Sequence, residues 1–90
     1  MSLASTPRMF SIQVSTTAVR LLTANPKRRG FLVYNNGSAT IYLLNKQTQT
    51  SSDGIPIPAG ASYNNDTCFG EYWVLAESGI QDIRVEEDAE

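Results

Sequence analysis

The fold of this chain is decided by GFLVYNNGSATIYLL, residues 30–44. Its two flanks, residues 30–35 and 39–44, are rich in the aromatic and β-branched residues that favour strands. Between them stands NNGS, in which Asn36-Gly37 is the strongest short signal for a hairpin, because both residues tolerate the positive φ that a type I′ turn needs. We therefore predict two antiparallel strands joined by a tight turn.

A period of two residues continues on both sides of this stretch. Phe10, Ile12 and Val14 alternate with polar residues, which is the pattern of a half-buried strand. Residues 18–23 fit either a strand or a short helix, and we favour a strand because strands surround them. Strands are thus predicted at residues 8–15 and 18–23 before the central stretch, and at 71–77 and 82–86 after it.

The two prolines of IPIPAG, residues 55–60, exclude a central strand and predict an edge strand or a crossing segment. Residues 45–54 contain no apolar side chain and are predicted to form a surface loop or a solvated edge strand. The count of about seven or eight short antiparallel strands is typical of an all-β protein, a single-domain β-sandwich or a small barrel. We expect residues 1–9 to be a flexible N-terminal arm, 10–86 the β-domain and 87–90 an acidic tail.

The charges are sorted along the chain. Residues 1–52 contain six basic residues and no acid, and residues 53–90 contain all nine acids and one arginine. Such sorting predicts a dipolar molecule, unless the two halves interleave in the fold. No apolar run approaches the roughly 20 residues of a membrane helix, and the start lacks the apolar core of a signal peptide. We expect production in the cytosol and no membrane partner.

Few residues of this chain could act in catalysis or bind a metal. The chain has no histidine and one cysteine, Cys68, which is expected to be a buried apolar side chain or a free thiol. Asn64, Asn65 and Asp66 could ligate calcium, but an Asx turn explains them better. The remaining candidates for an acid pair stand at turns or strand ends, where solvated acids are normal: Asp53, Asp66, Glu71 and Glu77. We predict no enzyme, no metal and no cofactor.

A basic run, NPKRRG at residues 25–30, contains Lys27, Arg28 and Arg29. The acidic net charge and the lack of a recognition helix disfavour nucleic acid. A strand-entry turn is the first interpretation, because Pro26 suits the second position of a turn. A docking contact with an acidic protein surface is the second, and under it charge reversal at Arg28 should leave the fold intact.

Two further side chains complete the predicted protein-contact set. Arg8 adds a basic group near the N-terminus. Trp73 alternates with Tyr72 and Val74, so one of these two sets faces outward or into a partner. The candidates are Arg8, Lys27, Arg28, Arg29 and Trp73.

The order of several motifs adds a resemblance. They are Arg29-Gly-Phe-Leu-Val-Tyr-Asn-Asn-Gly37, Thr40-Ile-Tyr42, Asp53-Gly-Ile-Pro-Ile-Pro-Ala-Gly60, Tyr72-Trp-Val74 and Ile83-Arg-Val-Glu86. This order resembles the small β-rich modules of tailed-bacteriophage virions, found in head decoration (cement) proteins and head fibres, over about residues 10–87. One departure is that Leu43-Leu44-Asn45-Lys46 runs on where a glycine is common, which suggests a longer loop.

The resemblance implies a jelly-roll-like β-sandwich that forms a homo-oligomer, a trimer. It would be a non-enzymatic capsid decoration protein, assembled in the bacterial host cytoplasm, that binds the major capsid protein on the outside of the phage head and stabilises the shell. Two alternatives stay open. The tyrosines and Trp73 would suit a carbohydrate- or receptor-binding module of a fibre, and a head–tail or tail component would share the sandwich.

Overall fold

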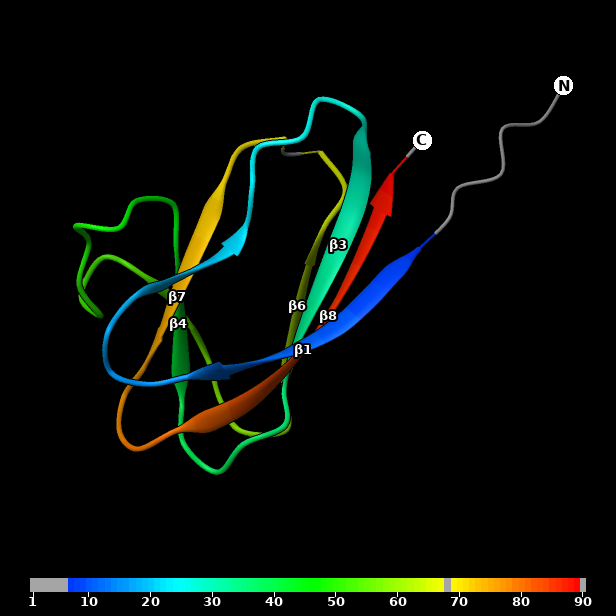
Figure 1. Cartoon of the computed structure of the whole chain (residues 1–90). Helices are drawn as coiled ribbons and strands as arrows, with labels where there is room; N and C mark the ends of the chain where they lie inside the picture. The colour runs from blue at the N-terminus through cyan, green and yellow to red at the C-terminus, as the bar shows by residue number, and fades with distance from the viewer. Residues whose placement is uncertain (1–6, 68, 90) are drawn as a thin grey trace, which may run out of the picture.

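The computed structural model describes residues 7–67 and 69–89, and within them the chain forms eight β-strands and no helix (Figure 1). The described part therefore includes no helix with the length and apolarity needed to cross a membrane. Most of the predicted N-terminal arm, residues 1–6, and Cys68 lie outside the described residues. The strands are β1 (Arg8–Val14), β2 (Val19–Leu22), β3 (Arg28–Asn35), β4 (Ile41–Leu44), β5 (Ile55–Ile57), β6 (Ser62–Asn65), β7 (Tyr72–Ala76) and β8 (Gln81–Ala89).

The strands form two four-stranded sheets that face each other (Figure 1). Sheet A has the order β1-β8-β3-β6 and sheet B the order β2-β7-β4-β5, and every neighbouring pair is antiparallel. Apart from β4 and β5, which are neighbours in sheet B, successive strands alternate between the sheets, as in a double-sheet jelly roll. The predicted all-β, jelly-roll-like sandwich is thus confirmed, and so are the strand at residues 18–23 and the edge position of the proline-containing strand β5.

The core lies between the sheets and is filled by alternate residues of the central strands. Val33 of β3, Ile83 of β8 and Val74 of β7 are fully buried. Phe31 bridges the two layers, since its ring centroid lies 6.1 Å from that of Tyr63 in sheet A and 4.7 Å from that of Tyr72 in sheet B. Because burial of one such side chain contributes about 1.5–3 kcal/mol, these alternating positions supply most of the driving force for packing the sheets.

The predicted Asn36-Gly37 hairpin is wrong. β3 belongs to sheet A and β4 to sheet B, so NNGS carries the chain from one sheet to the other. Among the described residues positive φ occurs only at Gly60 and Gly79, which excludes a type I′ turn here. The crossing is held by Asn35, whose buried side-chain nitrogen donates to the carbonyls of Ala39 at 2.8 Å and Ile57 at 2.9 Å.

A second buried amide braces the same crossing. The side-chain oxygen of Gln81 accepts hydrogen bonds from the backbone N–H groups of Ser38 at 2.7 Å and Ala39 at 3.1 Å. Gly37 is required for this approach, because a Cβ there would stand 2.1 Å from the same oxygen. The glycine that looked like a turn residue is therefore needed for close packing against β8.

The boundaries of the domain also differ from the prediction. β8 runs to Ala89 and pairs with β1 on one side and β3 on the other, so residues 87–89 belong to the sandwich and are not an acidic tail. Arg8 and Met9 lie within β1, so the domain begins earlier than residue 10. β6 was not predicted, because its sequence, SYNN, is mostly polar.

Candidate interaction surfaces

Arg28 is a buried structural residue and cannot serve as a docking contact in this fold. It is 2% exposed and is the largest of the fully buried side chains. Its Nε donates to Glu87 Oε2 at 2.8 Å, and its terminal nitrogens donate to the backbone carbonyls of Gly70 at 2.7 Å and Thr23 at 2.5 Å. The prediction of a contact role for Arg28 is thus corrected, and with it the expectation that charge reversal would leave the fold intact.

Arg8 shares the carboxylate that Arg28 uses. Its Nη2 donates to Glu87 Oε1 at 2.7 Å, while its side chain stays 59% exposed. Burial raises the pKa of Glu87, but the hydrogen bonds and charges of Arg28 and Arg8 outweigh burial and hold that pKa below its ordinary value. Arg8 remains a candidate contact, although part of its charge is already neutralised inside the molecule.

These pairs answer the question raised by the sorted charges. The acidic strand β8 lies between β1 and β3, whose first residues are Arg8 and Arg28. The halves of the chain therefore interleave, and the predicted dipolar molecule is not formed at this end of the fold.

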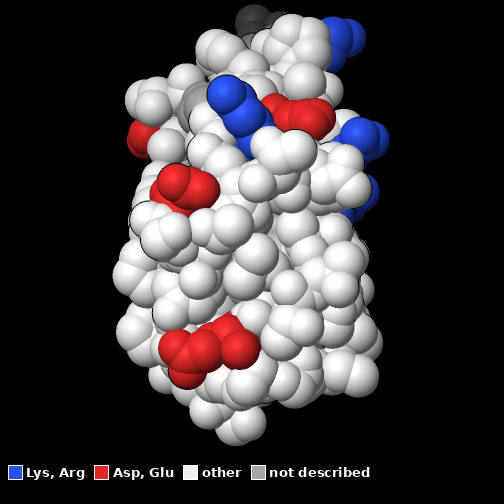
Figure 2. Space-filling model, turned by 90° about the vertical axis from the view of Figure 1, so that its left-hand side faces the viewer, with Lys and Arg blue, Asp and Glu red and all other residues white. Residues whose placement is uncertain are grey.

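Of the remaining basic residues of NPKRRG, Lys27 lies in the turn that enters β3, as predicted, and Arg29 is the second residue of that strand. The N–H of Arg28 donates to Asn25 O at 3.1 Å, and the N–H of Lys27 donates to Asn25 Oδ1 at 3.0 Å. Lys27 and Arg29 are exposed. Because they are exposed, these two residues stay as candidate contacts with an acidic surface. Figure 2 shows that basic side chains lie toward the upper end of the molecule, with acidic ones among them.

Trp73 lies on the outer face of sheet B. The neighbouring Val74 is fully buried, whereas Trp73 is half-buried and alternates with it. The guanidinium of Arg20 lies 5.1 Å from the centroid of the Trp73 ring. The indole Nε1–H of Trp73 donates to Glu71 Oε1 at 3.1 Å. The indole is thus engaged by its own neighbours on this face.

Of the predicted acid candidates, Asp53 and Glu71 line one groove, and Glu71 accepts the indole N–H of Trp73. Among the described residues no group of three or more His, Cys, Asp or Glu side chains is arranged to hold a metal ion. Asn65 Oδ1 accepts the N–H of Thr67 at 2.9 Å, which confirms the predicted Asx turn.

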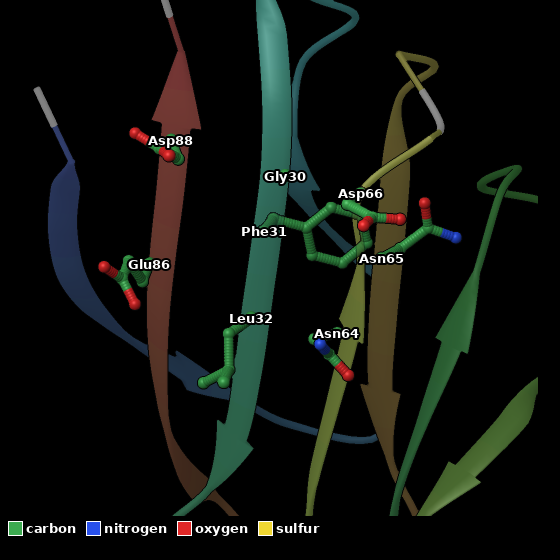
Figure 3. Close-up of a pocket in the computed structure, with 8 residues that line it drawn as sticks. All are labelled: Gly30, Phe31, Leu32, Asn64, Asn65, Asp66, Glu86 and Asp88. Carbon is green, nitrogen blue, oxygen red and sulfur yellow. The ribbon is translucent and has the colours of Figure 1, made fainter. Parts of the chain in front are cut away.

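A shallow depression of about 240 Å³ lies over Gly30 on the outer face of sheet A (Figure 3). Because Gly30 has no side chain, the surface drops between the flanking strands. Figure 3 shows Glu86 and Asp88 of β8 on one side and Asn64 of β6 on the other. This acidic hollow offers hydrogen-bond acceptors on a flat sheet face.

A larger groove lies on the outer face of sheet B. Residues 45–54 fold back over this face, and Gly54 packs so closely on Leu44 that a Cβ at residue 54 would lie 2.8 Å from its side chain. Leu44, which points away from the core, is only 2% exposed as a result. The longer loop suggested by Leu43-Leu44-Asn45-Lys46 is present. The pair of adjacent leucines indicated where it lies: only one of two neighbours in a strand can face the core, so the other leucine needs cover on the outer face.

The comparisons with known proteins show the fold and no family. No protein-family model matches the chain, and no curated protein is similar to it. A solved structure described under "Bacillus endospore appendages form a novel family of disulfide-linked pili" superposes with a TM-score of 0.52 at 14% sequence identity. The match covers 97% of this chain and 88% of that one, so the two share an architecture over nearly their whole length.

Proposed function

We propose that this protein is a non-enzymatic structural subunit that works within a larger assembly of protein chains. The observation that supports this most directly is the end-to-end similarity of its jelly roll to a chain of an appendage described as a pilus. The amino-acid composition agrees, because the chain has no histidine for acid–base catalysis.

The surface supplies material for such contacts. Large apolar side chains are exposed on the described part of the molecule: Met9 at 72%, Ile55 at 45%, Phe69 at 52% and Ile80 at 69%. Met9 and Ile55 lie on β1 and β5, which are edge strands of their sheets. Edge strands present backbone donors and acceptors to other chains. A domain of this size also has a thin stability margin that burial in an assembly would widen.

The finer proposal is a capsid decoration protein that binds the outside of a phage head as a trimer. The order of motifs, which resembles that of phage decoration modules, supports it. The exposed Lys27 and Arg29 would pair with acidic groups of the major capsid protein.

To test this, the purified protein is mixed with undecorated phage heads, binding is measured by sedimentation, and the stability of the shell is measured by thermal melting. Binding that raises the melting temperature is expected, and the double variant Lys27→Glu/Arg29→Glu should weaken it at low salt. Heads that neither bind the wild-type protein nor gain stability would exclude decoration. Normal binding by the double variant would show only that the basic turn is not the contact.

A second candidate is a subunit of an extracellular appendage, and the structural neighbour is the observation that favours it. The chain has a single cysteine, so any disulfide would join it to another chain. Light scattering and electron microscopy of the purified protein under oxidising conditions separate the candidates. Fibres indicate an appendage subunit, discrete trimers indicate decoration, and a monomer at all concentrations that also fails to bind heads would refute the structural role.

A further inference from the structure

The groove on the outer face of sheet B, called here the sheet-B groove, has the size of a small-ligand site. Its volume is about 500 Å³, within the range of roughly 300–1,000 Å³ usual for such sites. Tyr42 of β4 and Leu75 of β7 are directly opposite each other in the sheet and line the groove. The other lining comes from the loop of residues 47–51, from the β1–β2 connection at Thr16 and Ala18, and from Glu77 beyond β7.

The lining is rich in hydroxyl and amide groups and carries little charge. It includes Thr16, Gln47, Gln49, Thr50 and Ser51, with a single carboxylate and no lysine or arginine. Figure 2 views the molecule from the side of sheet B, and charged side chains are sparse over the middle of this side. Hydroxyl and amide groups act as donors and acceptors at once, and they match a ligand that carries many hydroxyl groups of its own.

Two of the polar groups are already fixed in place. The hydroxyl of Tyr42 donates to Glu77 Oε1 at 3.1 Å, and the backbone N–H of Glu77 donates to Thr40 O at 2.9 Å. The hydrogen bond to Glu77 raises the pKa of Tyr42 above its ordinary value. A carboxylate held in this way can accept further hydrogen bonds without being reordered first.

Gln49 is oriented by the start of its own loop. Its side-chain oxygen accepts the backbone N–H groups of Asn45 at 2.9 Å and Lys46 at 3.2 Å. These bonds fix the plane of the amide, and its two N–H donors have no partner among residues 7–67 and 69–89. A donor held in a groove and left for a ligand reduces the entropy lost on binding.

From this arrangement we propose that the sheet-B groove binds a neutral carbohydrate. The apolar face of a sugar ring lies against Tyr42 and Leu75, while its hydroxyl groups bond to Glu77 and Gln49. Trp73, the aromatic residue that first suggested sugar binding, does not line the groove and is engaged by Arg20. The site lies within a single chain, so it does not depend on the assembly proposed above.

The test is titration of the ¹⁵N-labelled protein with lactose, maltotriose, cellotriose and chitotriose, each to about 10 mM, a range suited to millimolar affinities. We expect at least one of these sugars to shift backbone resonances in β4, the end of β7 and residues 47–51. Tyr42→Ala and Gln49→Ala should each raise the dissociation constant, Tyr42→Ala by at least about tenfold. Tyr34→Ala is the matched control, since Tyr34 is a half-buried tyrosine on the outer face of sheet A, and it should bind as the wild type does.

Four outcomes would overturn the proposal. The first is the absence of shifts with all four sugars, and the second is a set of shifts outside the groove. The third is binding that Tyr42→Ala leaves unchanged while its spectrum shows a folded protein. The fourth is sialyllactose, an anionic sugar, binding as tightly as lactose, because the carboxylate of Glu77 in the groove should disfavour it. None of these results bears on assembly, which is measured separately by light scattering.

Discussion

Replacing Arg28 with methionine tests the role of the buried ion pair. Methionine keeps an unbranched side chain at a position that is 2% exposed, but it is shorter than arginine, so it removes the charge and the donors and leaves part of the buried space unfilled. Glu87, whose side chain is 7% exposed, would then keep Arg8 as its ionic partner at the surface. The backbone carbonyls of Gly70 and Thr23 would lose the donors that now satisfy them.

The size of the effect follows from these contacts. Removing one partner of a buried pair costs about 3–5 kcal/mol, because the other charge stays buried. A domain of 90 residues has a total stability of roughly 4–13 kcal/mol at 0.05–0.15 kcal/mol per residue. One kcal/mol lowers Tm by about 4–8 °C in a domain of this size, so Arg28→Met should lower it by at least about 12 °C.

The assay is urea unfolding followed by the fluorescence of Trp73, the single tryptophan, and by circular dichroism. Lys27→Met is the matched control. Lys27 immediately precedes Arg28 but is exposed, so its replacement should change the free energy of unfolding by less than about 0.5 kcal/mol. Arg28→Met/Glu87→Leu removes both charges and should be more stable than Arg28→Met alone. Equal stabilities of Arg28→Met and Lys27→Met would refute the reasoning. If the double variant is no more stable than Arg28→Met, the loss of stability comes from the unpaired carbonyls of Gly70 and Thr23 and not from the charge of Glu87.

Three further predictions follow from contacts in the same strands. The pKa of Glu87 is lowered in the folded state, so the ionised carboxylate stabilises the fold above the ordinary carboxyl pKa, and this stabilisation is lost as the pH falls through the folded pKa. Urea unfolding of Glu87→Gln at several pH values should therefore show a weaker loss of stability in acid than the wild type shows. Gly37→Ala should cost about 1–3 kcal/mol because its Cβ meets the side chain of Gln81, whereas Gly70→Ala, which meets nothing within 4 Å, should melt near the wild type. Truncation after Glu86 should abolish the cooperative thermal transition, and a well-folded truncated protein would restore the idea of an acidic tail.

The strand positions could be predicted because burial alternates along each strand. Phe10, Ile12 and Val14 face the core and their polar neighbours face solvent, so the period of two was visible in the residues themselves. Pro56 in β5 and Pro58 just after it identified an edge strand, because proline has no ladder donor. Both signals come from neighbouring residues, so they predict where a strand lies and whether it is an edge strand.

The pairing of strands could not be predicted in the same way. Asn36-Gly37 is a strong local turn signal, yet β3 pairs with β8 and β6 and not with β4. The EEDAE segment looked solvated because its charges were considered alone, whereas Glu87 is neutralised by arginines from β1 and β3. The missed clue was the continuing alternation of Ile83, Val85 and Glu87, which keeps position 87 on the inner face.

The place of β8 in sheet A also constrains how the chain can fold. β8 is a central strand, and both β1 and β3 pair with it and not with each other. During synthesis, N-terminal segments leave the ribosome first, so β1 has no partner strand and β3 has only β6 until residues 81–89 have emerged. Such distant pairing slows folding, and the waiting edges are open to wrong partners. The order of the strands therefore makes the insertion of β8 between β1 and β3 a late and slow step of folding.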